Sequence, residues 1–316
     1  MKQLIITGDD FGYSRTVNEA IIRARREGFL TSASLMPCGF DFEYAAEQAR
    51  QTPKLSVGVH LCLLQGRAVL PHVEIPALTD ADGNFHNNPF VFGLKLFVVP
   101  GVRRQIEREL RAQMAKFLAT GLRPAHINTH MHLHAHPVVF PIIAQLGREH
   151  GIRFLRVPRQ NFRSLLLDRR FFARKLARGL FFWVLSAGLQ AKIKRAGFRH
   201  PDAIYGLLQT GHLDETYLLR VLRQIGEGVT EIYFHPGADD DPILQRWQPD
   251  YDHAAETAAL LSPRVKQLLQ ELGIQLIGFE GAIYPLATAS GSAAVVPAKG
   301  APPAGPRQTE TGDSAS

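Results

Sequence analysis

Short apolar runs alternate with helical patterns along most of the chain. Apolar runs predict strands over residues 4–7, 30–36, 55–61, 126–132, 152–157, 203–207, 231–235 and 274–279. Apolar residues at helical spacing between them predict helices over residues 16–27, 42–50, 106–117, 137–151, 214–225 and from Ser262 onward. This alternation is typical of a mostly parallel sheet, open or closed, and we expect a closed (β/α) barrel.

Two stretches depart from this pattern. Residues 65–100 are rich in Pro, Gly and Asn, which predicts a long irregular insertion. Residues 287–316 are mostly Ala, Gly, Pro, Ser and Thr, with almost nothing large to bury, which predicts a disordered tail. We therefore expect one barrel domain over residues 1–286, with a basic amphipathic insertion at 161–200, and then the tail.

Positive charge is concentrated in that insertion. The formal net charge is +7, but residues 161–200 contribute +9 from ten Lys or Arg against a single Asp, so the rest sums to −2. Leu, Phe and Trp interleave with these cations, which favours an anionic membrane surface as the partner. The residues expected to face it are Arg169, Arg170, Arg174, Phe181 and Trp183. An ordinary amphipathic helix pair is the alternative, and we expect no nucleic-acid partner because no recognition motif accompanies the charge.

No segment predicts a membrane span or an export signal. The longest interior apolar stretch, residues 179–189, is well below the roughly 20 residues needed to cross a bilayer. The N-terminus passes from a short apolar run directly into acidic residues, unlike a signal peptide. Two cysteines, Cys38 and Cys62, make no disulfide framework and fit a reducing compartment. We expect a cytoplasmic protein that can associate peripherally with the inner membrane.

Several predicted strands end in acidic or imidazole side chains. Asp9 and Asp10 follow the first strand, His60 lies at the end of the third, and His235 ends a late one. Five His fall within eleven residues, at His126, His130, His132, His134 and His136. Parallel strands bring their carboxyl ends to one rim, so these groups predict a divalent metal site with acid and base groups.

The His-rich segment is the most informative of these signals. Alternate residues of an extended chain share a face about 6.6 Å apart, so its imidazoles are expected to line one wall. One ion can bind only one or two of them. Taken singly, each signal has an ordinary explanation: a strand-to-turn exit for the acidic pair, a core histidine at His60, a solvated loop, and a strand end at His235.

The motifs together resemble a known family. TGDDFG, VGVHL, HINTHMHLHAHP and FHPG, in this order, are similar to the YdjC-type carbohydrate deacetylases, which are related to the polysaccharide deacetylase superfamily. The five spaced His ending in His-Pro, with VRRQ and ATGL before them, resemble the hopanoid biosynthesis-associated HpnK branch. The likeness covers about residues 1–285.

The resemblance implies an irregular TIM-like barrel and a metal-dependent N-deacetylase. Asp10, His60 and His130 would bind the ion, Asp9 would be the general base and His235 the general acid. His132 and His134 would lie in the second shell or bind substrate. The ion would be Zn²⁺ or a similar transition metal, with Mg²⁺ as the alternative. The segment differs from many relatives at Asn128-Thr129, where Asp-Gly or Asp-Ser is common.

An N-acetylated amino sugar is the expected substrate, and for the hopanoid branch it is lipid-linked. Amide hydrolysis needs an activated water, a stabilised oxyanion and a proton for the departing amine, which this residue set can supply. The alternatives are a soluble chitooligosaccharide deacetylase and a non-catalytic metal- or lipid-binding accessory protein. A phosphate-ester hydrolase is less favoured because no Gly-rich phosphate loop is present. The oligomeric state is not indicated.

Overall fold

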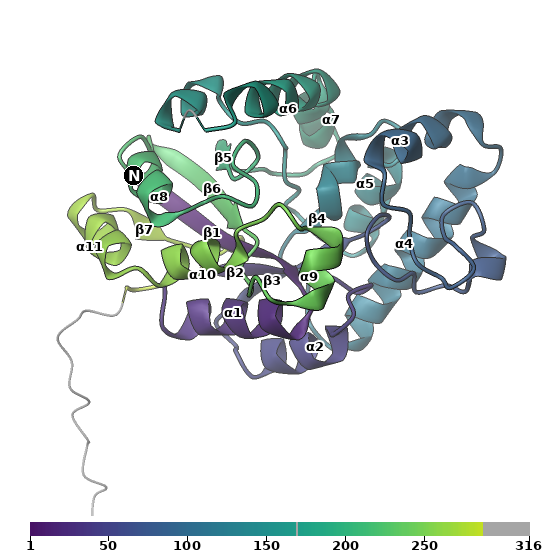
Figure 1. The fold of residues 1–316 in the computed structure, drawn as a ribbon, viewed down its shortest axis with the longest axis horizontal. Helices are drawn as coiled ribbons and strands as arrows, with labels where there is room; N and C mark the ends of the chain where they lie inside the picture. The colour runs from purple at the N-terminus through teal and green to yellow at the C-terminus, as the bar shows by residue number, and fades with distance from the viewer. Residues whose placement is uncertain (169, 287–316) are drawn as a thin grey trace, which may run out of the picture. The chain divides into compact units, whose positions relative to one another are not determined.

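The computed structural model describes residues 1–168 and 170–286 (Figure 1). The membrane-facing prediction for Arg169 and the disordered-tail prediction for 287–316 lie outside the described residues.

Six parallel strands curl into half a barrel. Their order along the sheet is β4 (Ile127–Thr129), β3 (Ser56–Leu61), β2 (Ser32–Leu35), β1 (Lys2–Phe11), β6 (Gly228–Phe234) and β5 (Ala203–Tyr205). The short β7 (Gln275–Leu276) pairs in parallel with the first half of β1. Isolated parallel bridges, Ile127 with Leu155 and Phe154 with Arg199, continue the curl beyond β4. The predicted irregular, TIM-like barrel is confirmed.

Helices follow the strands and pack around the sheet (Figure 1). They include α1 (Arg15–Arg26), α2 (Phe42–Arg50), α4 (Val102–Ala119), α5 (Phe140–Glu149), α8 (Glu215–Leu222), α9 (Pro242–Trp247), α10 (His253–Leu261) and α11 (Pro263–Glu271). In α1, the Ser14 side chain caps the helix by accepting from the Val17 amide at 3.4 Å. Val17, Ile21 and Ala24 then recur at helical spacing on its buried face.

Aliphatic side chains of the strands form the core on which the site depends. Leu4, Ile6, Val59, Leu61 and Ile232 have no exposed surface. Full burial of one such side chain contributes roughly 1.5–3 kcal/mol. The core therefore fixes the strands, and with them the polar side chains at their carboxyl ends.

Residues 65–100 were expected to be irregular throughout, and this expectation is wrong for the last part of the stretch. Pro89–Val98 forms a helix, α3, and His72–Glu74 forms a short 3-10 turn. The Asn88 side chain caps α3 by accepting from the amides of Phe90 and Val91 at 3.0 and 3.1 Å. A composition averaged over the whole stretch hid this ten-residue helix. The predicted strand 152–157 is also reduced to isolated bridges, and the strand over 274–279 to two residues.

The basic insertion is largely helical. It contains a 3-10 segment (Phe162–Leu167), α6 (Phe172–Leu185) and α7 (Leu189–Arg195). Phe181 and Trp183 are 47% and 46% exposed, so part of α6 leaves its apolar side chains in water. Across residues 1–168 and 170–286, no helix has the length and apolar character that a membrane span requires.

Some charges of the insertion are used within the protein. Lys175 is buried, with Nζ 2.6 Å from the Asp168 carboxylate. Arg170 pairs with Asp168 at 3.0 Å and with Asp214 at 2.8 Å. Arg174 lies 3.7 Å from the Asp250 carboxylate. The surface charge is therefore smaller than the sequence count suggests.

Candidate metal centre

Asp9 and Asp10 lie where β1 departs from regular geometry. Its register with β2 shifts just after Gly8, and Asp10 has a φ of 60°. Neighbouring side chains of a regular strand point to opposite faces, but a bulge re-aims one of them. Both carboxylates therefore reach partners inside the barrel: Asp9 contacts Arg156, and Asp10 contacts His130.

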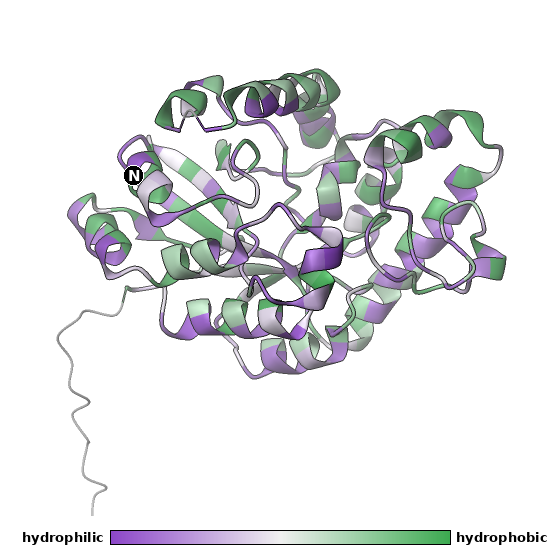
Figure 2. Ribbon diagram, in the orientation of Figure 1, coloured by the Kyte–Doolittle hydropathy of each residue, from purple (hydrophilic) through white to green (hydrophobic). Residues whose placement is uncertain are grey.

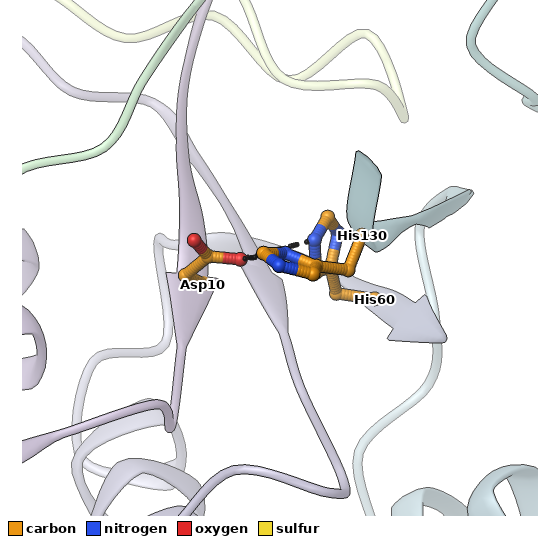
Figure 3. A group of neighbouring side chains, drawn as sticks. All are labelled: Asp10, His60 and His130. Carbon is orange, nitrogen blue, oxygen red and sulfur yellow. Dashed lines mark hydrogen bonds and ion pairs between the residues drawn. The ribbon is translucent and has the colours of Figure 1, made fainter. Parts of the chain in front are cut away.

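Asp10, His60 and His130 form a buried cluster at the strand ends (Figure 3). Asp10 Oδ1 lies 2.8 Å from His130 Nδ1 and 3.2 Å from His60 Nε2. One donor atom from each residue lies within 4.8 Å of the other two. Since bonds from zinc to nitrogen or oxygen are about 2.0–2.2 Å long, these atoms can share one ion. The structure thus brings together the three side chains expected to be ligands.

The electrostatics of the cluster fit a cation. Burial raises the pKa of Asp10, but the charges and hydrogen bonds of His130 and His60 outweigh it and hold that pKa well below its usual value. Burial lowers the pKa of each imidazole. The Asp10 carboxylate, together with Asp9 in the case of His60, more than reverses this, so the pKa of both imidazoles is raised. The carboxylate is thus balanced by imidazole protons. A divalent ion would replace these protons, because metal ligands must be deprotonated.

His60 is oriented by its neighbour on β4. Asn128 is the register partner of His60, and its amide lies 2.7 Å from His60 Nδ1. Turned one way, the amide oxygen accepts the Nδ1 proton. Turned the other way, the amide donates to Nδ1 and its oxygen accepts from Arg156 at 3.2 Å. Binding of a cation at Nε2 requires the first orientation, because only then does Nδ1 carry the proton.

Two amides that the sequence analysis missed complete the surroundings of the cluster. Gln248, just after α9, donates to Asp10 Oδ2 at 2.7 Å. Gln65 Oε1 lies 3.0 Å from His130 Nε2, and the Tyr13 hydroxyl donates to the Gln65 carbonyl. Single glutamines in loops carry no spacing signal, so no pattern in the sequence could identify them.

Asp9 is held by a buried network rather than by the cluster itself. Arg156, 1% exposed, bonds both carboxylate oxygens of Asp9 and also pairs with Glu231 at 2.6 Å. The Ser34 hydroxyl donates to Asp9 at 2.7 Å. Burial raises the pKa of Asp9, but Arg156 overcomes this and holds that pKa well below its usual value. Asp9 is therefore ionised at neutral pH.

Arg156 is the largest omission of the sequence analysis. It lies in the apolar stretch IRFLRV, where Arg153 is exposed and Arg156 is fully enclosed. The one available signal in the sequence was a cation inside a strand-like run, and this signal does not identify the carboxylates that pair with it. Its carboxylate partners come from β1 and β6, far away in sequence.

His235 follows β6 and is 8% exposed. Its backbone amide donates to Glu256, and its Nδ1 lies 4.0 Å from the same carboxylate. Its ring packs near Tyr251 and Tyr233, with centroids 5.2 and 5.7 Å away. Burial lowers the pKa of His235 to about 4, although Asp10 and Asp9 oppose the shift. Free His235 is therefore neutral at pH 7.

Glu256, which supports His235, should make stability depend on pH. Burial raises the pKa of Glu256 from 4.5 to about 8. Between these values the folded chain holds a proton that the unfolded chain has released, so its stability falls as pH rises, by about 1.4 kcal/mol per pH unit. We expect Glu256→Gln to remove this slope. Denaturant unfolding of both proteins at pH 5 and 8 measures it, and parallel slopes would contradict the assignment.

The expectation that the His-rich segment forms one wall is wrong. β4 ends at Thr129, and His130–Ala135 forms a 3-10 turn in which Met131 and His132 have φ of 53° and 56°. The chain turns here because it must leave the strand end and enter α5. Of this turn, His130 reaches Asp10, while His132 Nε2 lies 2.9 Å from the Tyr233 hydroxyl.

The other imidazoles of the segment also have separate surroundings. His134 Nδ1 lies 2.8 Å from the Thr129 hydroxyl, and burial lowers the pKa of His134 to about 3. His126 lies 3.0 Å from Ser34 and outside the metal cluster. The His136 ring packs on Phe97, with centroids 4.8 Å apart. His132 and His134 are therefore not part of the cluster.

Comparison with known proteins agrees with this site. Residues 3–271 match the family described as YdjC-like protein. A carbohydrate deacetylase of Brevibacillus brevis is 33% identical over 284 residues, covering 88% of this chain and 98% of its own. A chitooligosaccharide deacetylase of Yersinia pestis is 31% identical over 286 residues, with coverage of 88% and 98%.

One solved structure matches the fold over the same range. It is a putative cellobiose-phosphate cleavage protein from Enterococcus faecalis, with a TM-score of 0.69 and 28% identity. The match covers 88% of this chain and 98% of that one.

The fold and the site together define a barrel hydrolase with a candidate metal centre. The chain belongs to the YdjC-like family. The predicted enzyme class, a hydrolase of amide bonds, is confirmed through its deacetylase relatives. The narrower resemblance to the HpnK branch stays a prediction.

Proposed function

We propose that this chain removes the acetyl group from an N-acetylated amino sugar in a metal-dependent hydrolysis. The observation that carries the proposal is the buried Asp10–His60–His130 cluster with the ionised Asp9 beside it. A metal site with a separate carboxylate next to it has what amide hydrolysis needs.

One carboxylate and two imidazoles would hold the ion. This donor set favours Zn²⁺ or a neighbouring transition metal over Mg²⁺, which prefers oxygen ligands. When bound, the ion supplies Lewis acidity toward a water molecule and toward the amide carbonyl.

The protein's own groups would move the protons. Asp9, held by Arg156 and Ser34, would accept the proton of the attacking water. His235 would donate a proton to the departing nitrogen. Because its pKa of about 4 keeps free His235 neutral, it must first take up a proton, which negative charge on the reacting substrate favours. The net reaction consumes water and releases acetate and an amine.

We further propose that the sugar is carried by a hopanoid lipid and is met at an anionic membrane surface. The proposal is supported by the sequence likeness to the HpnK branch and by α6, whose Phe182 ring lies 5.4 Å from the His132 ring. The soluble alternative, a chitooligosaccharide, is favoured by the name of the Yersinia relative. A non-catalytic accessory protein is the remaining alternative.

Acetate release distinguishes these functions. We expect release from N-acetylglucosaminyl bacteriohopanetetrol to exceed release from acetylated chitobiose, and a chelator to abolish both because the ligand cluster would lose its ion. Restoring zinc should restore release, which controls for damage by the chelator. A preference for chitobiose would support the soluble enzyme, and no release from either substrate would support the accessory protein.

A further inference from the structure

We infer that α3 inserts into an anionic lipid bilayer beside the basic helices α6 and α7. The inference rests on the proposed function, in which the enzyme meets a lipid-linked sugar at a membrane surface. It goes further by naming α3 as the helix that enters the hydrocarbon layer of the bilayer.

The outward face of α3 is apolar. Five of its ten residues are large hydrophobic side chains between 63% and 72% exposed, namely Phe90, Val91, Leu94, Phe97 and Val98. At 3.6 residues per turn they occupy an arc of about 120°. A soluble surface helix normally turns such a stripe toward the core and its polar side toward water. In α3 the stripe faces water instead, although the opposite side of the helix is also apolar.

The helix is nevertheless built into the protein. Phe92 and Leu96, on its other side, are 1% and 5% exposed and belong to the main core. The Asn88 cap and Pro89 fix its start. α3 is therefore anchored in the core on one side, while its other side exposes the apolar stripe.

The stripe is continuous with the exposed part of α6. The Phe90 and Phe181 rings meet edge to face, with centroids 5.8 Å apart. Figure 2 shows hydrophobic colouring along both helices. Leu180 and Val184 of α6 add exposed surface of 49% and 65%. A joined apolar area of this kind marks an interaction site.

Charge complementarity selects a membrane as the occupant. Lys192, Lys194 and Arg195 are exposed on α7, and none of them forms a salt bridge within residues 1–168 and 170–286. α7 directly follows α6 along the chain. Exposed apolar side chains combined with unpaired Lys and Arg are typical of helices that lie in the interface of anionic bilayers.

The same two helices touch the loop that carries a candidate ligand. Phe97 of α3 packs on His136, and Phe182 of α6 packs on His132. His132 lies within the 3-10 segment that begins at His130, and His136 directly follows that segment. A lipid-linked sugar entering between membrane and protein would therefore arrive beside the metal cluster.

Vesicle flotation tests the inference. The probe is phosphatidylcholine vesicles containing phosphatidylglycerol, and the variant is Val91→Gln with Leu94→Gln, which removes apolar surface without adding charge. We expect binding about tenfold weaker or more at both low and high salt, because lost apolar burial is not screened. Lys192→Gln with Lys194→Gln and Arg195→Gln should instead weaken binding only at low salt, by about fivefold per charge. Val73→Gln, at an exposed valine outside the patch, is the matched control.

The outcomes separate the alternatives. Binding of the α3 variant equal to wild type, with unchanged unfolding midpoints, overturns the inference. Absent vesicle binding together with a concentration-dependent dimer that the α3 variant loses also overturns it and assigns the patch to a second copy. Flotation does not use activity, so a failed acetate assay with intact α3-dependent binding rejects only the proposed function.

Discussion

Replacing His60 by alanine should remove both the bound ion and turnover, whereas Asp9→Asn should keep the ion and lower turnover about 100- to 10,000-fold. His60 Nε2 lies 3.2 Å from Asp10, inside the cluster. Asp9 is directed instead to Arg156 and Ser34. Asp10 and its neighbour Asp9 therefore have different roles, and only the residues of the Asp10–His60–His130 cluster should determine the metal content.

Metal analysis after dialysis and kcat on the same samples measure this prediction. His150→Ala, at an exposed histidine away from the site, is the control and should change neither quantity. Equal loss of metal in the His60 and Asp9 variants would show that Asp9 is itself a ligand. Full turnover of Asp9→Asn would remove it from the reaction.

Arg156→Met should cost about 3–5 kcal/mol of unfolding free energy, since it leaves two buried carboxylates without their cation. Asp9 and Glu231 both bond Arg156, and neither they nor Arg156 exceeds 1% exposure. The same change should weaken turnover, because the pKa of Asp9 is held low mainly by Arg156 against burial. Chemical denaturation of the wild type and the variant at neutral pH measures the change in unfolding free energy.

Two companion variants make this result specific. Arg153→Met removes an exposed arginine of the same stretch and should change stability by less than about 0.5 kcal/mol. Adding Glu231→Gln to Arg156→Met should recover part of the loss, because one of the two uncompensated charges is gone. No recovery, or equal effects of the two arginine variants, would contradict the role of Arg156 as the shared counter-ion.

The parts of the site that followed from sequence are those with a local signature. Asp10, His60 and His130 each follow or end an apolar run, and parallel strands bring such positions to one rim. Arg156 and Gln248 have no such signature, since their partners lie 147 and 238 residues away along the chain. The expected wall of histidines failed because an alternating pattern does not reveal where a strand ends.

The sequence alone determined the alternation of strands and helices, the rim on which chemistry would lie, and the residue types available to bind a cation, because periodicity and strand-end chemistry are local properties. Only the tertiary structure decided that Asp9 pairs with a buried arginine while its neighbour turns toward two imidazoles. It also decided that α3 presents an apolar face to solvent. Such outcomes depend on which distant segments share a low-dielectric interior and which are left outside it, and no short window of sequence contains that information.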